Sequence, residues 1–191
     1  MSCVNTANIQ AAAGVLAGAR SPLFEPLPDG HRTLLIVGLG NPILGDDGVG
    51  WRVAEAVGAM LPAEEVVCLA LGGLSLMERL VGYRQAIIID AIQTRGGTPG
   101  DVYTLPLDAL PNLSAGHTTA IHDTSLQNAL ALGRRMGATL PTEINVVAIE
   151  AERVYDFSET LSPAVAAAIP EATAAVVALL TQMRGESHDL A

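Results

Sequence analysis

Hydrophobic positions along this chain follow two different periods, and their alternation predicts a sheet covered by helices. Short runs of branched apolar residues, bounded by glycine or polar residues, are typical of strands. Five segments have this character: 33–39, 66–71, 86–92, 101–105 and 143–150. Apolar residues recur at helical spacing in four others: about 49–60, 74–81, 123–136 and from 163 onward.

Strands that alternate with helices predict right-handed crossovers and a mainly parallel sheet. We therefore expect an α/β fold, a three-layer α/β/α sandwich with a mainly parallel five-stranded sheet. The segment DVYTL, 101–105, is expected to be an exposed edge strand. Pro170 lies inside the last helical pattern, where proline should kink or restart the helix.

The length of 191 residues suits one domain with added ends. We expect a single α/β domain over residues 33–184, an N-terminal extension over 1–32 and a C-terminal tail over 185–191. Whether the extension is ordered or partly disordered is left open.

Composition and charge narrow the classes of partner. Half of the residues are hydrophobic, only 3% are aromatic, and the formal net charge is -10. An acidic chain argues against nucleic acid and anionic membrane surfaces as partners. Cys3 and Cys68 form no CxxC pair, which favours a reducing, cytoplasmic compartment. We see no secretory signal, and no apolar run reaches the ~18 residues of a transmembrane helix.

Polar residues that could carry chemistry stand where the predicted strands and helices meet. Asp46 and Asp47 end the loop after the first strand, Asp90 stands near the end of the third, and His122 precedes the third helix. In a parallel sheet, ligands bind beyond the carboxyl ends of the strands. Two carboxylates and an imidazole suit nickel or zinc, and three ligands leave positions open for water or substrate.

Each of these residues also has a structural interpretation. Asp90 could accept backbone hydrogen bonds, although an ionised carboxylate after an apolar strand is costly unless it is paired or bound. Asp46 and Asp47 could cap the first helix, and we expect that one caps and one binds. His122 could have no ligand role, and His117 is a competitor five residues away.

The glycine loop GLGNPILGDDG does not fit a dinucleotide site. Its spacing departs from G-x-G-x-x-G, no acid follows the second strand, and Asp46 with Asp47 would repel a pyrophosphate. Protease motifs such as G-x-S-x-G and H-E-x-x-H are missing from the sequence. The residues alone therefore indicate a metal-binding α/β protein, with hydrolysis as an open alternative.

Three motifs carry a resemblance to a known family. They are IVGLGNPILGDDGVG at 36–50, IIIDA at 87–91 and HDTSLQNAL at 122–130. In order and spacing, over roughly 33–184, the chain resembles the hydrogenase maturation endopeptidases. The resemblance implies a phosphorylase/hydrolase-like fold and an aspartic-type endopeptidase-like hydrolase. Such an enzyme cuts the C-terminal extension from a nickel–iron hydrogenase large-subunit precursor after nickel insertion.

Carried over by motif position, Asp47, Asp90 and His122 would be both the catalytic and the metal-contacting residues. The substrate would supply the nickel, with zinc or cadmium as a surrogate. Which carboxylate acts as base is left open. The expected partner is the hydrogenase precursor, with no nucleic acid and no membrane, and the chain itself is expected to be a monomer or weak dimer.

The chain departs from the family pattern in two places. Many members carry Asp-Gly-Gly after the second strand, where this chain has Leu71 followed by two glycines. Members often have Pro-Glu where this chain has Ala151 and Glu152, and we expect Glu152 to be a solvated loop acid. The unusual loop formed by Tyr155, Asp156 and Phe157 is a candidate contact of the partner. Two rival functions remain: a non-catalytic nickel-binding docking module, or a different metallohydrolase on the same fold.

Overall fold

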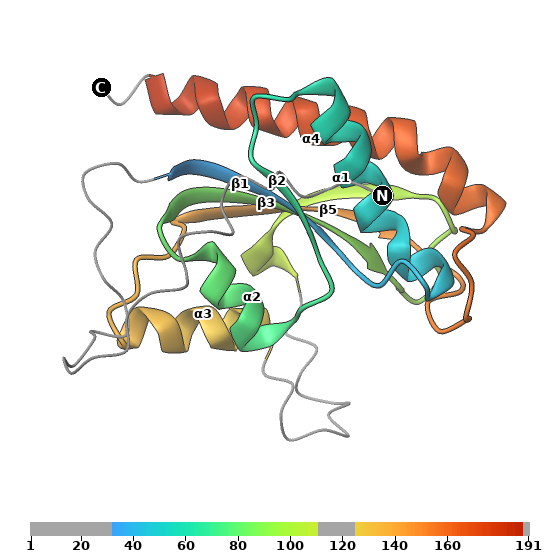
Figure 1. Cartoon of the computed structure of the whole chain (residues 1–191), viewed down its shortest axis with the longest axis horizontal. Coiled ribbons are helices and arrows are strands. Elements are labelled where there is room, and N and C mark those ends of the chain that lie inside the picture. The colour runs from blue at the N-terminus through green and yellow to red at the C-terminus, as the bar shows by residue number, and fades with distance from the viewer. Residues whose placement is uncertain (1–31, 111–124, 189–191) are drawn as a thin grey trace, which may run out of the picture.

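A computed structural model describes residues 32–110 and 125–188 of the chain and shows a central sheet between two helical layers (Figure 1). Its strands are β1 Arg32–Leu39, β2 Val66–Leu69, β3 Tyr83–Ile92, β4 Val102–Pro106 and β5 Glu143–Glu150. Its α-helices are α1 Val49–Met60, α2 Gly73–Leu80, α3 Leu126–Arg135 and α4 Pro163–His188. Two short 3-10 helices, η2 Gly45–Gly48 and η3 Leu107–Ala109, connect them.

The sheet has the strand order β2-β1-β3-β5-β4. Strand β1 pairs in parallel with β2 and β3, with Ile36 opposite Val66 on one side and Ile87 on the other. Strand β5 continues the parallel sheet, and β4 pairs antiparallel with it at the edge. The prediction of a mainly parallel five-stranded sheet with 101–105 at its edge is therefore confirmed.

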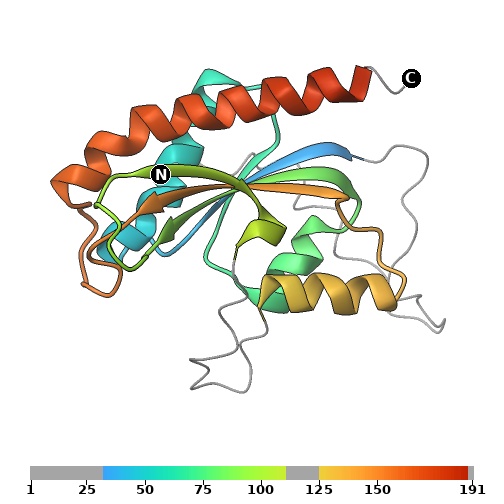
Figure 2. The same ribbon diagram turned by 180° about the vertical axis from the view of Figure 1, so that it is seen from behind.

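Alternate residues of the buried strands enter two separate cores. Ile36, Ile87 and Ile149 pack under α1 and α4, whereas Val37, Ile88 and Ala148 pack over α2 and α3. Both faces of the sheet are covered by helices, which explains why the sequences of the strands are nearly continuous runs of apolar residues. Figures 1 and 2 show α4 and α1 on one side of the sheet and α2 and α3 on the other, which completes the three layers.

The last helix differs from the sequence expectation. Helix α4 is continuous from Pro163 to His188 with Pro170 inside it, so the helix does not restart at this proline, and the alternative of a kink stays a prediction. Its buried side chains lie on both sides of the proline, for example Ala168 and Ala172, and this packing on the sheet holds the helix together. The helix also reaches into the segment 185–191 that we expected to be a tail.

Helix α4 also bears on the question of a membrane span. By length and composition alone, Pro163–Gly185 is apolar enough to cross a membrane, with a mean hydropathy of 1.8. The sequence does not predict a span in this segment, because polar residues interrupt its apolar run. In the structure the buried stripe that includes Val165, Val176 and Met183 lies on the sheet. A core helix passes the same test, so α4 is weak evidence for a span.

The crossovers place three loops at one edge of the sheet. The loops that follow β1, β3 and β5 all leave the carboxyl ends of parallel strands. The views from front and back both show the loop between β5 and α4, drawn in orange, beside the cyan segment that leads into α1. This carboxyl edge is where ligands bind in such sheets.

Candidate functional site

Asp46 is fully buried and holds two distant segments together. Its Oδ2 accepts the backbone N–H groups of Glu152 at 3.2 Å and Arg153 at 3.0 Å, and its Oδ1 accepts that of Ser162 at 2.6 Å. Burial alone would raise the pKa of Asp46, but these hydrogen bonds, led by that of Ser162, outweigh it and leave the pKa below its usual range.

This arrangement corrects the expectation that one of the two acids caps the first helix. The residue before η2 is Leu44 and the residue before α1 is Gly48, and neither helix start has a side-chain cap. Asp46 lies inside η2, so its carboxylate points to the β5–α4 loop and anchors that loop. The sequence motif hides this role because its partners lie more than a hundred residues away.

Asp47 follows Asp46 in the sequence and is partly exposed. Its Oδ2 accepts the backbone N–H of Asn41 at 2.6 Å, and Asn41 Oδ1 accepts that of Ile43 at 3.2 Å. Its own backbone N–H donates to the carbonyl of Leu44 at 3.2 Å. Among the described residues, the hydrogen bond to the Asp47 carboxylate is the one that Oδ2 accepts.

Gly40 makes this loop geometry possible. Its φ of +116° lies in a region that other L residues rarely adopt. A Cβ on Gly40 would also overlap the backbone oxygen of Asp47. The glycine in G-x-G-N therefore lets the loop fold back on itself and present the Asp47 carboxylate at the edge.

Asp90 is the second acid of the site. It faces the α2/α3 side of the sheet, two residues after buried Ile88 and opposite Ala148 in the register. Its Oδ1 accepts the backbone N–H of Ala91 at 2.9 Å. Burial raises the pKa of Asp90 to about 7, the Ala91 hydrogen bond opposes the shift, and the charge of Asp47 adds to it.

The structure thus brings together two of the three predicted site residues. Asp47 lies in η2, after β1, Asp90 lies on the neighbouring strand β3, and the charge of Asp47 is near enough to raise the pKa of Asp90. A divalent cation between them would replace this repulsion with attraction, and carboxylate oxygens are suitable ligands for it. A carboxyl with a pKa near neutrality also suits proton transfer.

His122, the third predicted residue, and its competitor His117 lie outside the described residues. Within 32–110 and 125–188, no group of three His, Cys, Asp or Glu side chains is placed to hold a metal ion. Helix α3, which begins four residues after His122, covers the same face of the sheet as Asp90. The order of the chain is therefore compatible with a third ligand there.

Glu150 is an acid at the same edge that the sequence reasoning treated only as the end of a strand. It is buried, and its two carboxylate oxygens accept the backbone N–H of Thr94 at 2.6 Å and the Thr94 hydroxyl at 2.9 Å. An acid after an apolar run, as in VVAIE, was the available signal. Both oxygens brace the β3–β4 loop, whereas Glu152 is exposed as expected.

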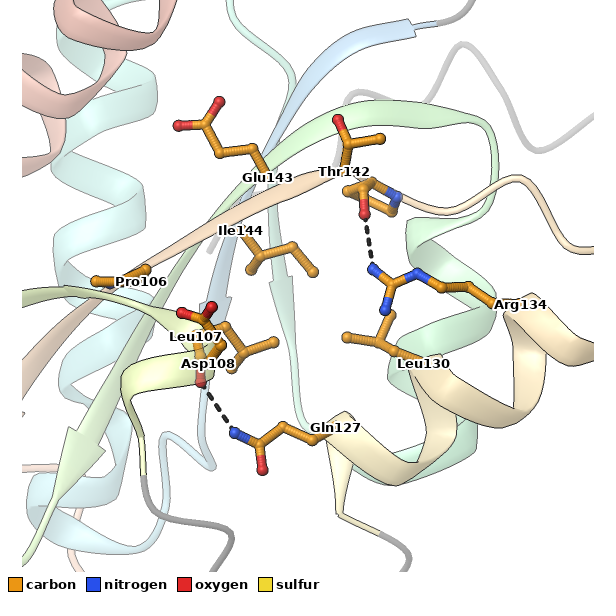
Figure 3. Close-up of a pocket in the computed structure, with 10 residues that line it drawn as sticks. Pro106, Leu107, Asp108, Gln127, Leu130, Arg134, Thr142, Glu143 and Ile144 are labelled. Atoms are coloured by element: carbon orange, nitrogen blue, oxygen red, sulfur yellow. Dashed lines mark hydrogen bonds between the residues drawn. The ribbon is translucent and has the colours of Figure 1, made fainter.

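A hollow of about 510 Å³ lies elsewhere in the fold, at the amino-terminal end of β5 (Figure 3). Its amide and guanidinium groups already bind the backbone: Gln127 donates to the carbonyl of Leu107 at 3.0 Å, and Arg134 to that of Pro141 at 3.0 Å. It contains neither Asp47 nor Asp90. We place the candidate site at the two acids because the ligating chemistry is there.

Comparison with known proteins adds independent findings. The sequence model of the HycI family, hydrogenase maturation protease, matches residues 51–179, a range that includes Asp90 and His122 and begins after Asp47. The hydrogenase expression/formation protein HupD of Rhodobacter capsulatus is 29% identical over 159 residues, covering 82% of this chain and 72% of that protein. The hydrogenase 2 maturation protease of Escherichia coli strain K12 is 28% identical over 152 residues, covering 78% and 91%.

The fold is also similar to solved structures. The hydrogenase maturating endopeptidase HybD of E. coli aligns with a TM-score of 0.65 and 27% identity, over 78% of this chain and 93% of that chain. This structural similarity agrees with the sequence matches in pointing to one group of proteins.

Proposed function

Because this chain belongs to the hydrogenase maturation protease family, we propose that it is the endopeptidase that removes the C-terminal extension of a nickel–iron hydrogenase large-subunit precursor. The proposal includes the order of events: cleavage follows nickel insertion, and the enzyme recognises the nickel that its substrate carries. The observation that supports it most is the acid pair, Asp47 and Asp90, at the carboxyl edge of the sheet.

In this proposal Asp47, Asp90 and His122 contact the substrate nickel and position the scissile peptide beside them. Asp47 uses its Oδ2 for Asn41, and Asp90 uses one oxygen for Ala91. Oxygen and imidazole ligands suit nickel, with zinc or cadmium as a surrogate. A site of three ligands leaves room for the substrate.

Hydrolysis then requires a water that attacks the scissile carbonyl carbon. One of the two carboxylates accepts a proton from this water, and the proton is later delivered to the amine that leaves. The water oxygen forms a new bond to the carbonyl carbon, the C–N bond breaks, and the products are a carboxylate and an amine. The step needs no oxidant and no reactant other than water. The sequence contains no G-x-S-x-G nucleophile motif, which favours an attacking water over a side-chain nucleophile.

We also propose that the protein acts in the cytoplasm, in a reducing environment. Cysteine usage supports this, because Cys3 and Cys68 form no recognisable disulfide framework.

The direct test is the mass of a hydrogenase large-subunit precursor before and after incubation with the protein. The proposal expects loss of a C-terminal fragment from nickel-loaded precursor and no loss from nickel-free precursor. Asp90→Asn should slow cleavage at least about a hundredfold, a typical loss for a positioned acid or base. Asp101→Asn, a change in an exposed acid at the same edge, is the matched control and should cleave normally.

Two other outcomes would replace the proposal. A stable complex without cleavage would indicate a docking module that binds the nickel site. Cleavage that is equally fast with nickel-free precursor would keep the endopeptidase but remove nickel recognition.

A further inference from the structure

Two aromatic side chains are strongly exposed on the loop that joins β5 to α4. Tyr155 and Phe157 are 84% and 88% exposed. The chain has only six aromatic residues, one Trp, three Tyr and two Phe. By contrast Trp51, Tyr83 and Tyr103 in the described residues are buried or partly buried. A chain this poor in aromatic residues therefore presents two of them to solvent on one loop.

The loop is held in place although it has no regular secondary structure. Asp46 accepts the backbone N–H groups on both sides of the aromatic pair, from Arg153 before it and from Ser162 after it. The backbone of Ser158 adds two more links, donating to Ile43 at 3.1 Å and accepting from Gly45 at 2.7 Å. A loop fixed at both ends binds a partner with a smaller loss of conformational entropy.

These same links place the loop against the acid site. Ile43, itself 46% exposed, belongs to the loop that carries Asp47 and lies beside Ser158. We call Ile43, Tyr155 and Phe157 the apolar rim. Asp46 and Asp47 follow Ile43 closely in the same loop, which the backbone of Ser158 contacts. Figures 1 and 2 show the orange loop between β5 and α4 beside the cyan segment that leads into α1.

We propose that the apolar rim is the docking surface for the folded body of the hydrogenase large-subunit precursor. The rim would hold the precursor beside the point where Asp47 and Asp90 contact its nickel. This inference rests on the proposed function and names the surface by which the same site holds its substrate. Exposed aromatic side chains on a fixed backbone are typical of the residues that dominate binding energy at protein interfaces.

The acidic residues around the apolar rim indicate which kind of precursor surface would fit it. Glu152, Asp156 and Glu159 surround the rim on the loop, with Arg153 as the one basic side chain between them. The whole chain carries a formal net charge of -10. The precursor surface that fits is an apolar depression bordered by Lys or Arg, since opposite charges steer association and fix the register of docking.

The test separates docking from chemistry. Steady-state cleavage of nickel-loaded precursor is measured for the wild type, for Tyr155→Ser with Phe157→Ser, and for a control double variant. The control, Met60→Ser with Met136→Ser, removes two exposed apolar side chains, 61% and 52% exposed, at the opposite edge of the sheet. All three proteins should have the same Tm, because none of these side chains is buried.

The rim variant should raise KM at least about tenfold, with kcat within about twofold of the wild type, whereas the control should match the wild type in both. Wild-type KM in the rim variant would overturn the inference. So would sedimentation showing that the rim instead joins two copies of this chain, with KM unchanged.

Failure of the proposed function is recognisable separately, because the wild type would then leave the precursor intact. Binding of precursor to immobilised protein would decide the inference in that case. A tenfold weaker Kd in the rim variant supports docking at the rim. Equal Kd values, or no binding by the wild type, overturn it.

Discussion

The carboxylate of Asp46 accepts the backbone N–H of Ser162 at 2.6 Å across 116 positions of the chain, and this bond joins the first sheet loop to the start of α4. Together with the bonds from Glu152 and Arg153, it makes one acid the anchor of the β5–α4 loop. The neighbouring Asp47 is left for the site. Two adjacent aspartates thus have separate tasks, because one points inward and the other lies partly in solvent.

Replacing this anchor should destabilise the protein. Asp46→Ala leaves three backbone N–H groups without their acceptor, and each unsatisfied buried donor costs about 1–3 kcal/mol. We expect the free energy of unfolding in urea to fall by about 3 kcal/mol or more. Glu152→Gln, in an exposed acid of the same loop, should stay within about 0.5 kcal/mol. Equal effects of the two changes would contradict the role of Asp46.

Acid should weaken the same anchor. Because the folded state lowers the pKa of Asp46, the folded protein binds fewer protons here than the unfolded chain. This stabilisation is complete above the ordinary aspartate pKa of about 3.9 and is lost as the pH falls through the lower folded value. The stability gap between wild type and Asp46→Asn should therefore be widest at neutral pH and narrow below about pH 4. Thermal unfolding at a series of pH values measures it.

Asp90 should show the opposite dependence. Burial and the charge of Asp47 raise the pKa of Asp90 in the folded protein to about 7. Between the pKa of Asp90 in the unfolded chain and pH 7, the folded protein therefore holds a proton that the unfolded chain has lost. The contribution of Asp90 to stability should decrease as the pH rises through this interval, and Asp90→Asn should remove the decrease. Carboxyl carbon NMR of metal-free protein should find the titration near 7 and shifted lower in Asp47→Asn. A titration of Asp90 near 4, the ordinary value, would refute this.

Gly40 offers a test of the loop that carries Asp47. Gly40→Ala places a Cβ at a φ of +116° and against the Asp47 backbone oxygen. Gly96→Ala has a positive φ of +83° and nothing within 4 Å, so it isolates the backbone strain. Strain alone costs about 1–2 kcal/mol, and overpacking adds about 1–3 kcal/mol. Gly40→Ala should thus lose more unfolding free energy than Gly96→Ala and should also slow precursor cleavage.

The two histidines of the segment between η3 and α3 can be separated by metal binding. Cadmium or zinc, added as a surrogate and followed by calorimetry, should bind more weakly to Asp47→Asn and to His122→Gln. His117→Gln, five residues away, should bind like the wild type. Binding should release protons, because ligands must be deprotonated to coordinate. A loss of binding in His117→Gln alone would assign the third ligand to the other histidine.

The sequence by itself determined the layers and most of the boundaries. Helix α1 at Val49–Met60 and strand β5 at Glu143–Glu150 lie where the apolar periodicity predicts them. This succeeds because both faces of a parallel sheet are buried and each covering helix needs one apolar stripe. The motifs around Asp47 and Asp90 also indicated the family that the comparisons confirm.

Only the tertiary structure decided what each acid does. The sequence places Asp46 beside Asp47 and leaves Glu150 at the end of a strand, but their partners, Ser162 and Thr94, lie far away along the chain. Local pattern cannot reveal a hydrogen bond whose acceptor and donor meet only when the sheet assembles. The continuity of α4 through Pro170 has the same origin, because packing on the sheet outweighs a local preference.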